Sequence, residues 1–137
     1  MSESEQIQET RRWLKYAEED LIAAERMAGQ DDIAPRHACW LAQQSAEKAI
    51  KAALVFLQIK FPKNHDLDAL RNQIPDGWTI KTEYPDLASL SEWAVEARYP
   101  GDWPEALERD ALAATKQARG ILSSIEADLS IRKFKFK

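Results

Sequence analysis

Two faces of small and apolar side chains run through residues 36–57, whose sequence is RHACWLAQQSAEKAIKAALVFL. The first face repeats at steps of three and four residues and comprises Ala38, Leu41, Ser45, Ala49, Ala52, Phe56 and Ile59. The second repeats one position over and comprises Cys39, Ala42, Ala46, Ile50, Ala53 and Leu57. A helix with two such faces can pack closely against several neighbours. The segment therefore predicts the central helix of a helical bundle.

Composition agrees with one helix-rich domain. The 137 residues are 45% hydrophobic and 31% charged, with only 4 Gly and 6 Pro, which is typical of a globular chain rather than a disordered one. The net charge of −4 provides no global field for binding nucleic acid. Cys39 is the single cysteine, so no intrachain disulfide can form, and we expect neither a metal site nor a cofactor. The polar N-terminus and the lack of a long apolar run predict a cytoplasmic protein without a membrane span.

Helix boundaries follow from capping residues and from Pro and Gly. Ser2 and Glu5 form a possible capping box for a first helix that stops at Gly29. Asp31 or Asp32 then caps the second helix, which ends before Pro62. A short third helix is expected at about 65–72, after Asn64 or Asp66. Residues 78–83 contain β-branched side chains, but one lone strand has no partner, so we expect a loop there.

The second half of the chain predicts two further helices. One runs from about Asp86 to Arg98 and stops at Tyr99-Pro100-Gly101. Asp102 and Glu105 form a second capping-box pattern before the last helix. That helix has the cleanest period in the chain: Leu107, Ala111, Ala114, Ala118, Ile121, Ile125 and Leu129. The expected fold is all-α, an antiparallel four- to five-helix up-and-down bundle spanning residues 1–130 as a single domain.

A basic and aromatic tail follows at 131–137, with the sequence IRKFKFK. It holds four positive charges and no negative ones, so the remaining chain has a net charge of −4 − 4 = −8. Alternating Phe and Lys are suited to contacting phosphates and stacking on bases. The alternative is a chain end whose two Phe pack on the bundle or on a partner.

Four segments occur in an order that resembles bacterial and archaeal HEPN-domain proteins: WLKYAEEDLIAAERM, HACWLAQQSAEKAIKAALV, NHDL and EARYP. The resemblance extends from about Trp13 to Leu129. It implies a helical bundle that dimerises and that pairs with a small nucleotidyltransferase in a toxin–antitoxin-like module. Many members are metal-independent ribonucleases that carry an Arg followed by four to six residues and a His.

This chain departs from that ribonuclease signature. Its histidines are His37 and His65, and neither has an Arg at the required distance before it. Arg98 stands at the matching helix end, but residues 99–105 contain no His. The first hypothesis is therefore a non-catalytic homodimeric partner of a nucleotidyltransferase, with possible nucleotide or RNA binding. The alternative is a divergent metal-independent ribonuclease in which Arg98 supplies the cation and Tyr99 or His65 the acid–base group.

Each candidate residue also has a structural interpretation. His65 suits a local hydrogen bond that fixes the loop after the second helix, and Arg98 suits the carbonyls of a helix C-terminus. A polar ridge on the central helix comprises Gln43, Gln44, Glu47, Lys48 and Lys51. The ridge is either a solvated stripe or a dimer interface or nucleotide-facing groove. The nucleotide- or RNA-binding candidates are Arg98, Lys48, Lys51 and Gln44.

Overall fold

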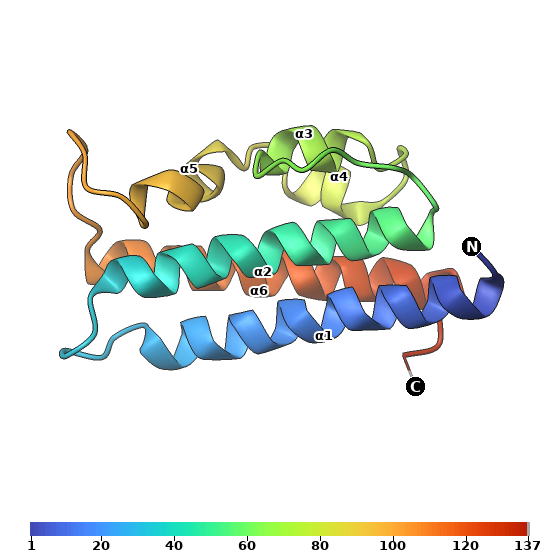
Figure 1. Ribbon diagram of the computed structural model, residues 1–137, viewed down its shortest axis with the longest axis horizontal. Coiled ribbons are helices and arrows are strands. Elements are labelled where there is room, and N and C mark those ends of the chain that lie inside the picture. Colours follow the sequence, from blue (N-terminus) through green and yellow to red (C-terminus); the bar gives the residue numbers. More distant parts are fainter. Residues whose placement is uncertain (137) are drawn as a thin grey trace.

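The computed structural model describes residues 1–136, and throughout that range the regular structure is helical. The helices are α1 (Glu3–Met27), α2 (Pro35–Phe56), α3 (Leu67–Asn72), α4 (Thr79–Glu83), α5 (Ala88–Glu96) and α6 (Glu108–Ile131). The three long helices α1, α2 and α6 lie side by side, and α3, α4 and α5 cover the opposite side of α2 from α1 (Figure 1). The predicted all-α helical bundle is confirmed, although α5 is much shorter than the three long helices. No helix in residues 1–136 is long and apolar enough to cross a membrane.

The first helix begins as the sequence predicts. Ser2 Oγ accepts a hydrogen bond from the backbone N–H of Glu5, and the Glu5 carboxylate accepts one from the N–H of Ser2. This capping box satisfies two of the free donors at the helix start. The helix ends at Met27, and Gly29 follows with φ +83°, a left-handed conformation that glycine adopts without steric cost. The capping-box prediction for α1 is therefore confirmed.

The central position predicted for residues 36–57 is confirmed. Most residues of both small-residue faces of α2 are buried, and the helix contacts α1, α6, α5 and α3. The alanines let neighbouring helices approach closely, and Ser45 Oγ donates across the gap to the Ala17 carbonyl of α1 at 2.8 Å. This bond satisfies a hydroxyl that would otherwise be buried without a partner.

The boundaries of α2 differ from the prediction. The helix N-cap is Ala34, with no side-chain cap, so the prediction that Asp31 or Asp32 caps it is wrong. Pro35 opens the helix, because its fixed φ suits the first turn and its missing N–H is not needed there. The helix ends at Phe56 in a Schellman turn, in which Gln58 has φ 57° and Ile59 N–H donates to the Leu54 carbonyl.

Residues 79–83 form a helix, so the predicted loop over 78–83 is wrong. The reason lies in α6: both carboxylate oxygens of Asp128 accept hydrogen bonds from Thr79, one from its backbone N–H at 2.7 Å and one from its hydroxyl at 2.9 Å. This cap comes from a residue 49 positions away. A cap so distant in sequence leaves no local signal.

The loop between α5 and α6 is longer than predicted. The Trp103 indole N–H donates to the Glu96 carbonyl at 3.1 Å and its ring packs against Gly101. The chain therefore stays irregular through residue 107, and the predicted capping box of Asp102 and Glu105 is wrong. Helix α6 instead begins after Leu107, whose N–H donates to the Asp110 carboxylate at 2.8 Å.

Candidate functional site

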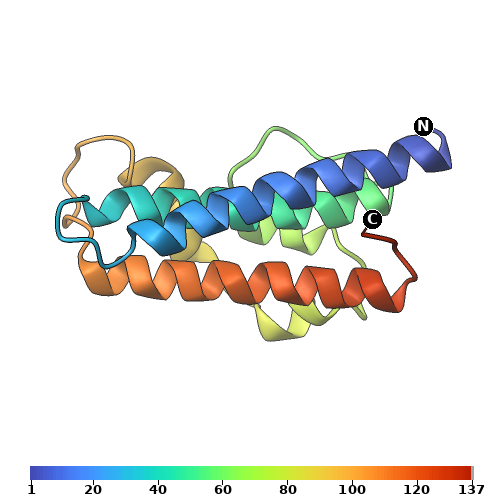
Figure 2. The same ribbon diagram turned by 90° about the horizontal axis from the view of Figure 1, so that it is seen from below.

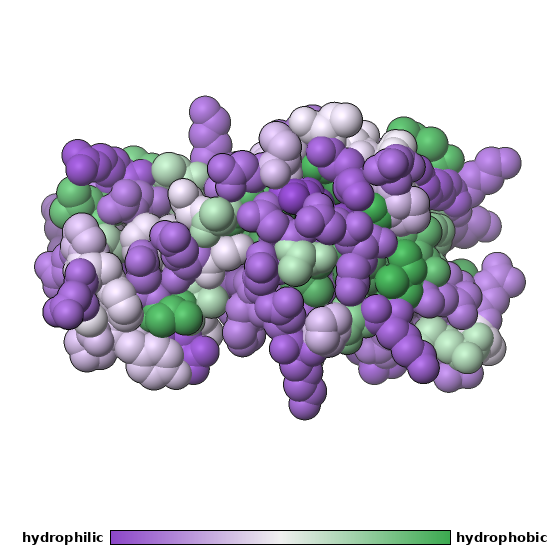
Figure 3. All heavy atoms as spheres, turned by 90° about the horizontal axis from the view of Figure 1, so that it is seen from above, coloured by the Kyte–Doolittle hydropathy of each residue, from purple (hydrophilic) through white to green (hydrophobic). Residues whose placement is uncertain are grey.

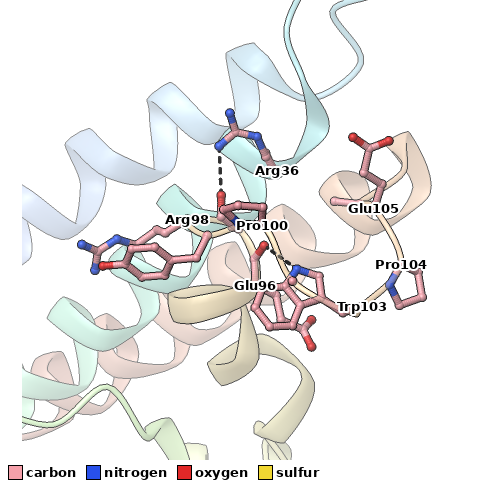
Figure 4. Close-up of a pocket in the computed structure, with 11 residues that line it drawn as sticks. Arg36, Glu96, Arg98, Pro100, Trp103, Pro104 and Glu105 are labelled. Carbon is pink, nitrogen blue, oxygen red and sulfur yellow. Dashed lines mark hydrogen bonds between the residues drawn. The ribbon is translucent and has the colours of Figure 1, made fainter.

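A hollow of about 510 Å³ lies where α5 ends and its following loop meets the start of α2 (Figure 4). Its rim and walls combine arginines, glutamates, aromatic rings and prolines. The lining residues are Arg36, Glu96, Ala97, Arg98, Tyr99, Pro100, Gly101, Trp103, Pro104, Glu105 and Ala106. Arg98 and Tyr99, two of the residues singled out from the sequence, are thus brought to one site.

Two side-chain hydrogen bonds fix the backbone that lines the hollow at the end of α5. Arg36, in the first turn of α2, donates from Nη1 to the Ala97 carbonyl at 3.1 Å. Trp103 donates to the Glu96 carbonyl from the other side. Both bonds satisfy carbonyls at the C-terminal end of α5, where helical partners are missing. The hollow is therefore a product of how α5 is terminated.

Arg98 lies at the edge of the hollow with its guanidinium near two aromatic rings. Its Cζ is 5.9 Å from the Trp40 ring centroid and 5.2 Å from that of Tyr99. Figure 4 shows this side chain pointing away from Trp103, Pro104 and Glu105. Among residues 1–136, Arg98 forms no ion pair, since no carboxylate oxygen lies within 4.0 Å of its guanidinium. Its positive charge remains free for a group supplied from outside the chain.

The hollow carries charge of both signs. Two carboxylates, of Glu96 and Glu105, line the hollow together with two arginines, Arg36 and Arg98. Burial, followed by the nearby charge of Glu92, raises the pKa of Glu96 above its ordinary value. A site with two cations, two carboxylates and exposed aromatic rings is suited to polar and planar groups. It has no histidine among the residues that line it.

His65 lies in a different place. Its Nδ1 is 2.7 Å from Oε1 of Glu47, and its backbone carbonyl accepts a hydrogen bond from Gln43 at 3.2 Å. These contacts tie the loop that precedes α3 to the middle of α2. The geometry matches the structural interpretation of His65, and the residue does not line the hollow of Arg98.

The polar ridge of α2 is largely buried, so a solvated stripe is wrong for Gln43, Glu47 and Lys51. Lys51 Nζ is 2.9 Å from Oε2 of Glu47 and lies over the rings of Trp13 and Phe61, at 5.8 and 5.4 Å from their centroids. These groups find their partners inside one chain.

The two remaining ridge residues are half-buried. Lys48 pairs with Asp20 of α1, and Gln44 donates to the Gln43 amide oxygen at 2.7 Å. Lys48, Lys51 and Gln44 therefore do not join Arg98 in one site. Their role in nucleotide or RNA binding stays a prediction.

A HEPN-domain family model matches residues 10–128. The chain belongs to the HEPN family. Among solved structures, TT1696 from Thermus thermophilus is similar with a TM-score of 0.73 and 25% identity, covering 86% of this chain and 96% of that one. ST0689, an archaeal HEPN homologue, is similar with a TM-score of 0.65 and 28% identity, covering 88% of this chain and 97% of that one. No curated protein gives a significant match.

Several residues of this HEPN hollow were missed from the sequence. Trp103 carried a signal, since an aromatic ring between Pro100-Gly101 and Pro104 is unusual for a solvated turn. Arg36 carried none, because its contact with Ala97 spans 61 residues. Within residues 1–136, the HEPN domain has no cluster of three or more His, Cys, Asp or Glu arranged to hold a metal ion.

Proposed function

We propose that this HEPN domain is a non-catalytic, cytoplasmic homodimer that engages a small nucleotidyltransferase in a toxin–antitoxin-like module. The observation that carries the proposal is the hollow that Arg98 borders, whose lining contains two arginines but no histidine. Acid–base groups contribute about 10²- to 10⁴-fold to such reactions. An Arg98 without an imidazole retains the capacity to bind an anionic group and loses most of the capacity to cleave RNA.

The position of His65 supports the same proposal. Its imidazole is engaged with Glu47, whose side chain is buried, and that carboxylate also holds Lys51. Recruiting His65 to Arg98 of its own chain would require breaking this network. The ribonuclease alternative would then have to rely on Tyr99, which is 53% exposed beside Arg98.

Exposed apolar side chains near the hollow support dimerisation at this end. Residues 1–136 expose eight large hydrophobic side chains, and four of them lie in residues 95–112: Val95, Tyr99, Leu107 and Leu112. Figure 3 shows apolar and intermediate residues at the α5 end, interrupted by hydrophilic ones, rather than one continuous apolar face. Such a mixed surface is typical of protein interfaces, in which aromatic and Arg side chains are enriched.

A dimer across this end would place two Arg98 side chains near one another. Two guanidinium groups with Tyr99 and Trp103 rings would suit a nucleotide or a short RNA segment, because phosphate prefers Arg and bases stack on aromatic rings. Nucleotide or RNA binding at the hollow is thus the finer part of the proposal.

Light scattering after size-exclusion chromatography tests the dimer. We expect the wild-type chain to elute with twice its monomer mass, and Val95→Glu with Leu112→Glu to elute as a monomer. The matched control is Tyr16→Glu on α1, which adds a charge at an equally exposed apolar residue far from the hollow. A wild-type monomer, or a dimer that survives the double substitution, would contradict the proposed interface.

Affinity purification of the tagged chain from its own host tests the partner. We expect a nucleotidyltransferase in near-stoichiometric yield, identified by mass spectrometry. Yield should fall with Val95→Glu and Leu112→Glu if the partner recognises the dimer. Recovery of the chain without any nucleotidyltransferase would contradict the proposal.

A further inference from the structure

We propose that the segment after α6, together with the first half of α1, binds single-stranded nucleic acid without sequence preference. This surface, the tail surface, consists of Arg11, Lys15, Lys133, Lys135 and Phe136. It lies at the opposite end of the bundle from the loop that forms the Arg98 hollow (Figure 1). The inference goes beyond the proposed function and depends on neither the dimer nor the nucleotidyltransferase. Lys137 lies outside the described residues and forms no part of this surface.

A Schellman turn fixes the direction of the tail. Lys133 has φ 63°, its N–H donates to the Ser130 carbonyl at 2.9 Å, and Phe134 N–H donates to the Leu129 carbonyl at 3.0 Å. Phe134 is then buried against Phe56, with ring centroids 5.8 Å apart and planes at 87°. The residues beside Phe134 are therefore held at defined positions, which lowers the entropy cost of binding.

Arg11 joins the tail to α1. Its Nε and Nη2 both donate to the Lys135 carbonyl, at 2.9 and 2.7 Å. The tail accordingly crosses from the end of α6 toward α1 (Figure 2). Lys15 follows Arg11 by one helical turn and shares its face of α1. Two cations of α1 thus adjoin the two exposed lysines of the tail.

These four cations lack acidic partners. Among residues 1–136, no carboxylate lies within 4.0 Å of Arg11, Lys15, Lys133 or Lys135. The chain as a whole has a net charge of −4, so a surface that carries four such cations differs in sign from the chain average. A run of phosphates would release counterions on contacting it, and that release drives sequence-independent binding.

Phe136 supplies a stacking platform. Its ring is 5.1 Å from that of Phe134 with planes at 85°, and 38% of the residue remains exposed. The edge-on contact orients Phe136 while leaving surface free for a base. Stacking of this type tolerates every base, because each presents a π-face. Exposed lysines in the same short segment as one exposed ring therefore match a backbone with bases attached.

Other polyanions fit less well. A protein partner needs roughly 800 Å² of contact on each side, or about 20–30 residues, and the tail surface consists of five. An anionic membrane surface favours an amphipathic helix with a broad apolar face. Exposed Ile131 and Phe136 do not form such a face, because residues 134–136 lie outside the helix.

Fluorescence anisotropy with labelled 12-mers of oligo(U) and oligo(dT), at low salt, tests the proposal. We expect weak binding, with a Kd of about 10⁻⁶–10⁻⁴ M, and similar affinities for RNA and DNA. Lys133→Gln with Lys135→Gln should weaken binding at least about fivefold. The same double substitution should flatten the log–log salt dependence by about 1.4, at about 0.7 for each phosphate that is no longer neutralised. Phe136→Ala should weaken binding at least about fivefold, because its ring no longer stacks on a base.

The matched control is Arg109→Gln with Lys116→Gln, which removes the same charge from exposed positions of α6. Binding in this control should stay within about twofold of wild type. All variants are checked for an unchanged thermal midpoint; a tail substitution that lowers it is replaced by Lys133→Ser with Lys135→Ser.

Four results would overturn the proposal. The first two are no binding by the wild-type chain, and equal losses in the tail and control variants. The third is loss through Arg98→Ala instead, which would move the site to the hollow. The fourth is tighter tail-dependent binding to phosphatidylglycerol vesicles, which would make the surface a membrane contact. Dimerisation and partner capture are unaffected by all four, so the two proposals fail separately.

Discussion

His65 and Glu47 are joined by a 2.7 Å contact between the imidazole Nδ1 and the carboxylate Oε1. The same carboxylate receives the ammonium of Lys51 through its second oxygen at 2.9 Å. Glu47 and Lys51 are both buried, so the central helix of this HEPN domain carries an ion pair inside the fold. The imidazole thereby closes a structural network and does not line the hollow that Arg98 borders.

Removing one member of the buried pair should be costly. We expect Glu47→Ala to lower the free energy of unfolding by roughly 3 kcal/mol, because Lys51 is left charged and unpaired among aromatic rings. The double substitution Glu47→Met with Lys51→Met should cost less than the single one, since no uncompensated charge remains. Urea denaturation, monitored by circular dichroism, measures the free energy of unfolding of both variants.

The exposed pair of Glu9 and Arg12 provides the control for that comparison. It is also a helical pair, but Arg12 is well exposed, so Arg12→Ala should cost under about 0.5 kcal/mol. A Glu47→Ala variant no less stable than Arg12→Ala would show that the buried pair does not hold the fold together.

The stability of the chain should depend on pH through Glu47. Burial alone would raise the pKa of Glu47, but hydrogen bonds from Lys51 and His65 outweigh burial, so the pKa lies below its ordinary value of 4.5. A carboxyl with a lowered pKa in the folded chain stabilises it fully above the unfolded pKa, and this stabilisation is lost as pH falls. The stability difference between wild type and Glu47→Gln should therefore be largest near pH 7 and shrink below about pH 4.5.

Urea denaturation of both proteins at pH values from 7 to 3 measures this difference. Comparing wild type with one variant cancels the titration of other carboxyls, including Glu96 and Glu126, whose pKa values are raised first by burial. A difference that stays constant down to pH 3 would mean that Glu47 titrates alike in the folded and unfolded chains.

How much the sequence predicts depends on how far apart the interacting residues lie. The long helices were predicted because their apolar period and the capping box of Ser2 and Glu5 are local signals. The Schellman turns that follow α2 and α6 were not predicted, because Gln58 and Lys133 take left-handed conformations that usually belong to Gly or Asn. Neither position carries the Gly or Asn from which such a turn is usually predicted.

The candidate site was predicted in part for the same reason. Arg98 and Tyr99 are adjacent in sequence and meet at the hollow, whereas Arg36 reaches it only through the fold. The burial of Lys51 in the polar ridge could not be predicted, because it depends on Trp13 and Phe61, which lie in other segments of the chain. Polar residues on a helix predict solvent exposure unless the partners that bury them, distant in sequence, are known.

The cap of α4 should contribute measurably to stability. Asp128 is buried and satisfies two donors of Thr79, so Asp128→Ala should lower the free energy of unfolding by about 1–3 kcal/mol. Ser130→Ala, at an exposed position of the same helix, should cost under about 0.5 kcal/mol. Equal midpoints for the two variants in urea would argue against the capping role.

Gly120 in α6 should resist replacement by alanine. The Tyr84 hydroxyl lies 1.9 Å from the place where a Cβ would be built, so the ring must move. Gly→Ala within a helix ordinarily stabilises by about 1 kcal/mol, whereas here we expect a loss of about 1 kcal/mol from overpacking.

Tyr84→Phe supplies the matched background for that substitution. Without the hydroxyl, the nearest ring atom is Cζ at 3.0 Å, so Gly120→Ala should become less harmful. The thermal midpoints of wild type, the two single variants and the double variant measure the coupling between the Tyr84 hydroxyl and the added methyl group at position 120. Additive effects would show that the hydroxyl does not set the space at Gly120.

The most direct test of the non-catalytic assignment is a cleavage assay without divalent metal. The purified protein and its Arg98→Ala variant are incubated with a pool of structured and single-stranded RNA, and products are resolved on a denaturing gel. We expect the wild-type protein to produce no cleavage beyond that of the variant. Cleavage by the wild type that disappears in Arg98→Ala would contradict this account and establish a ribonuclease with a divergent site.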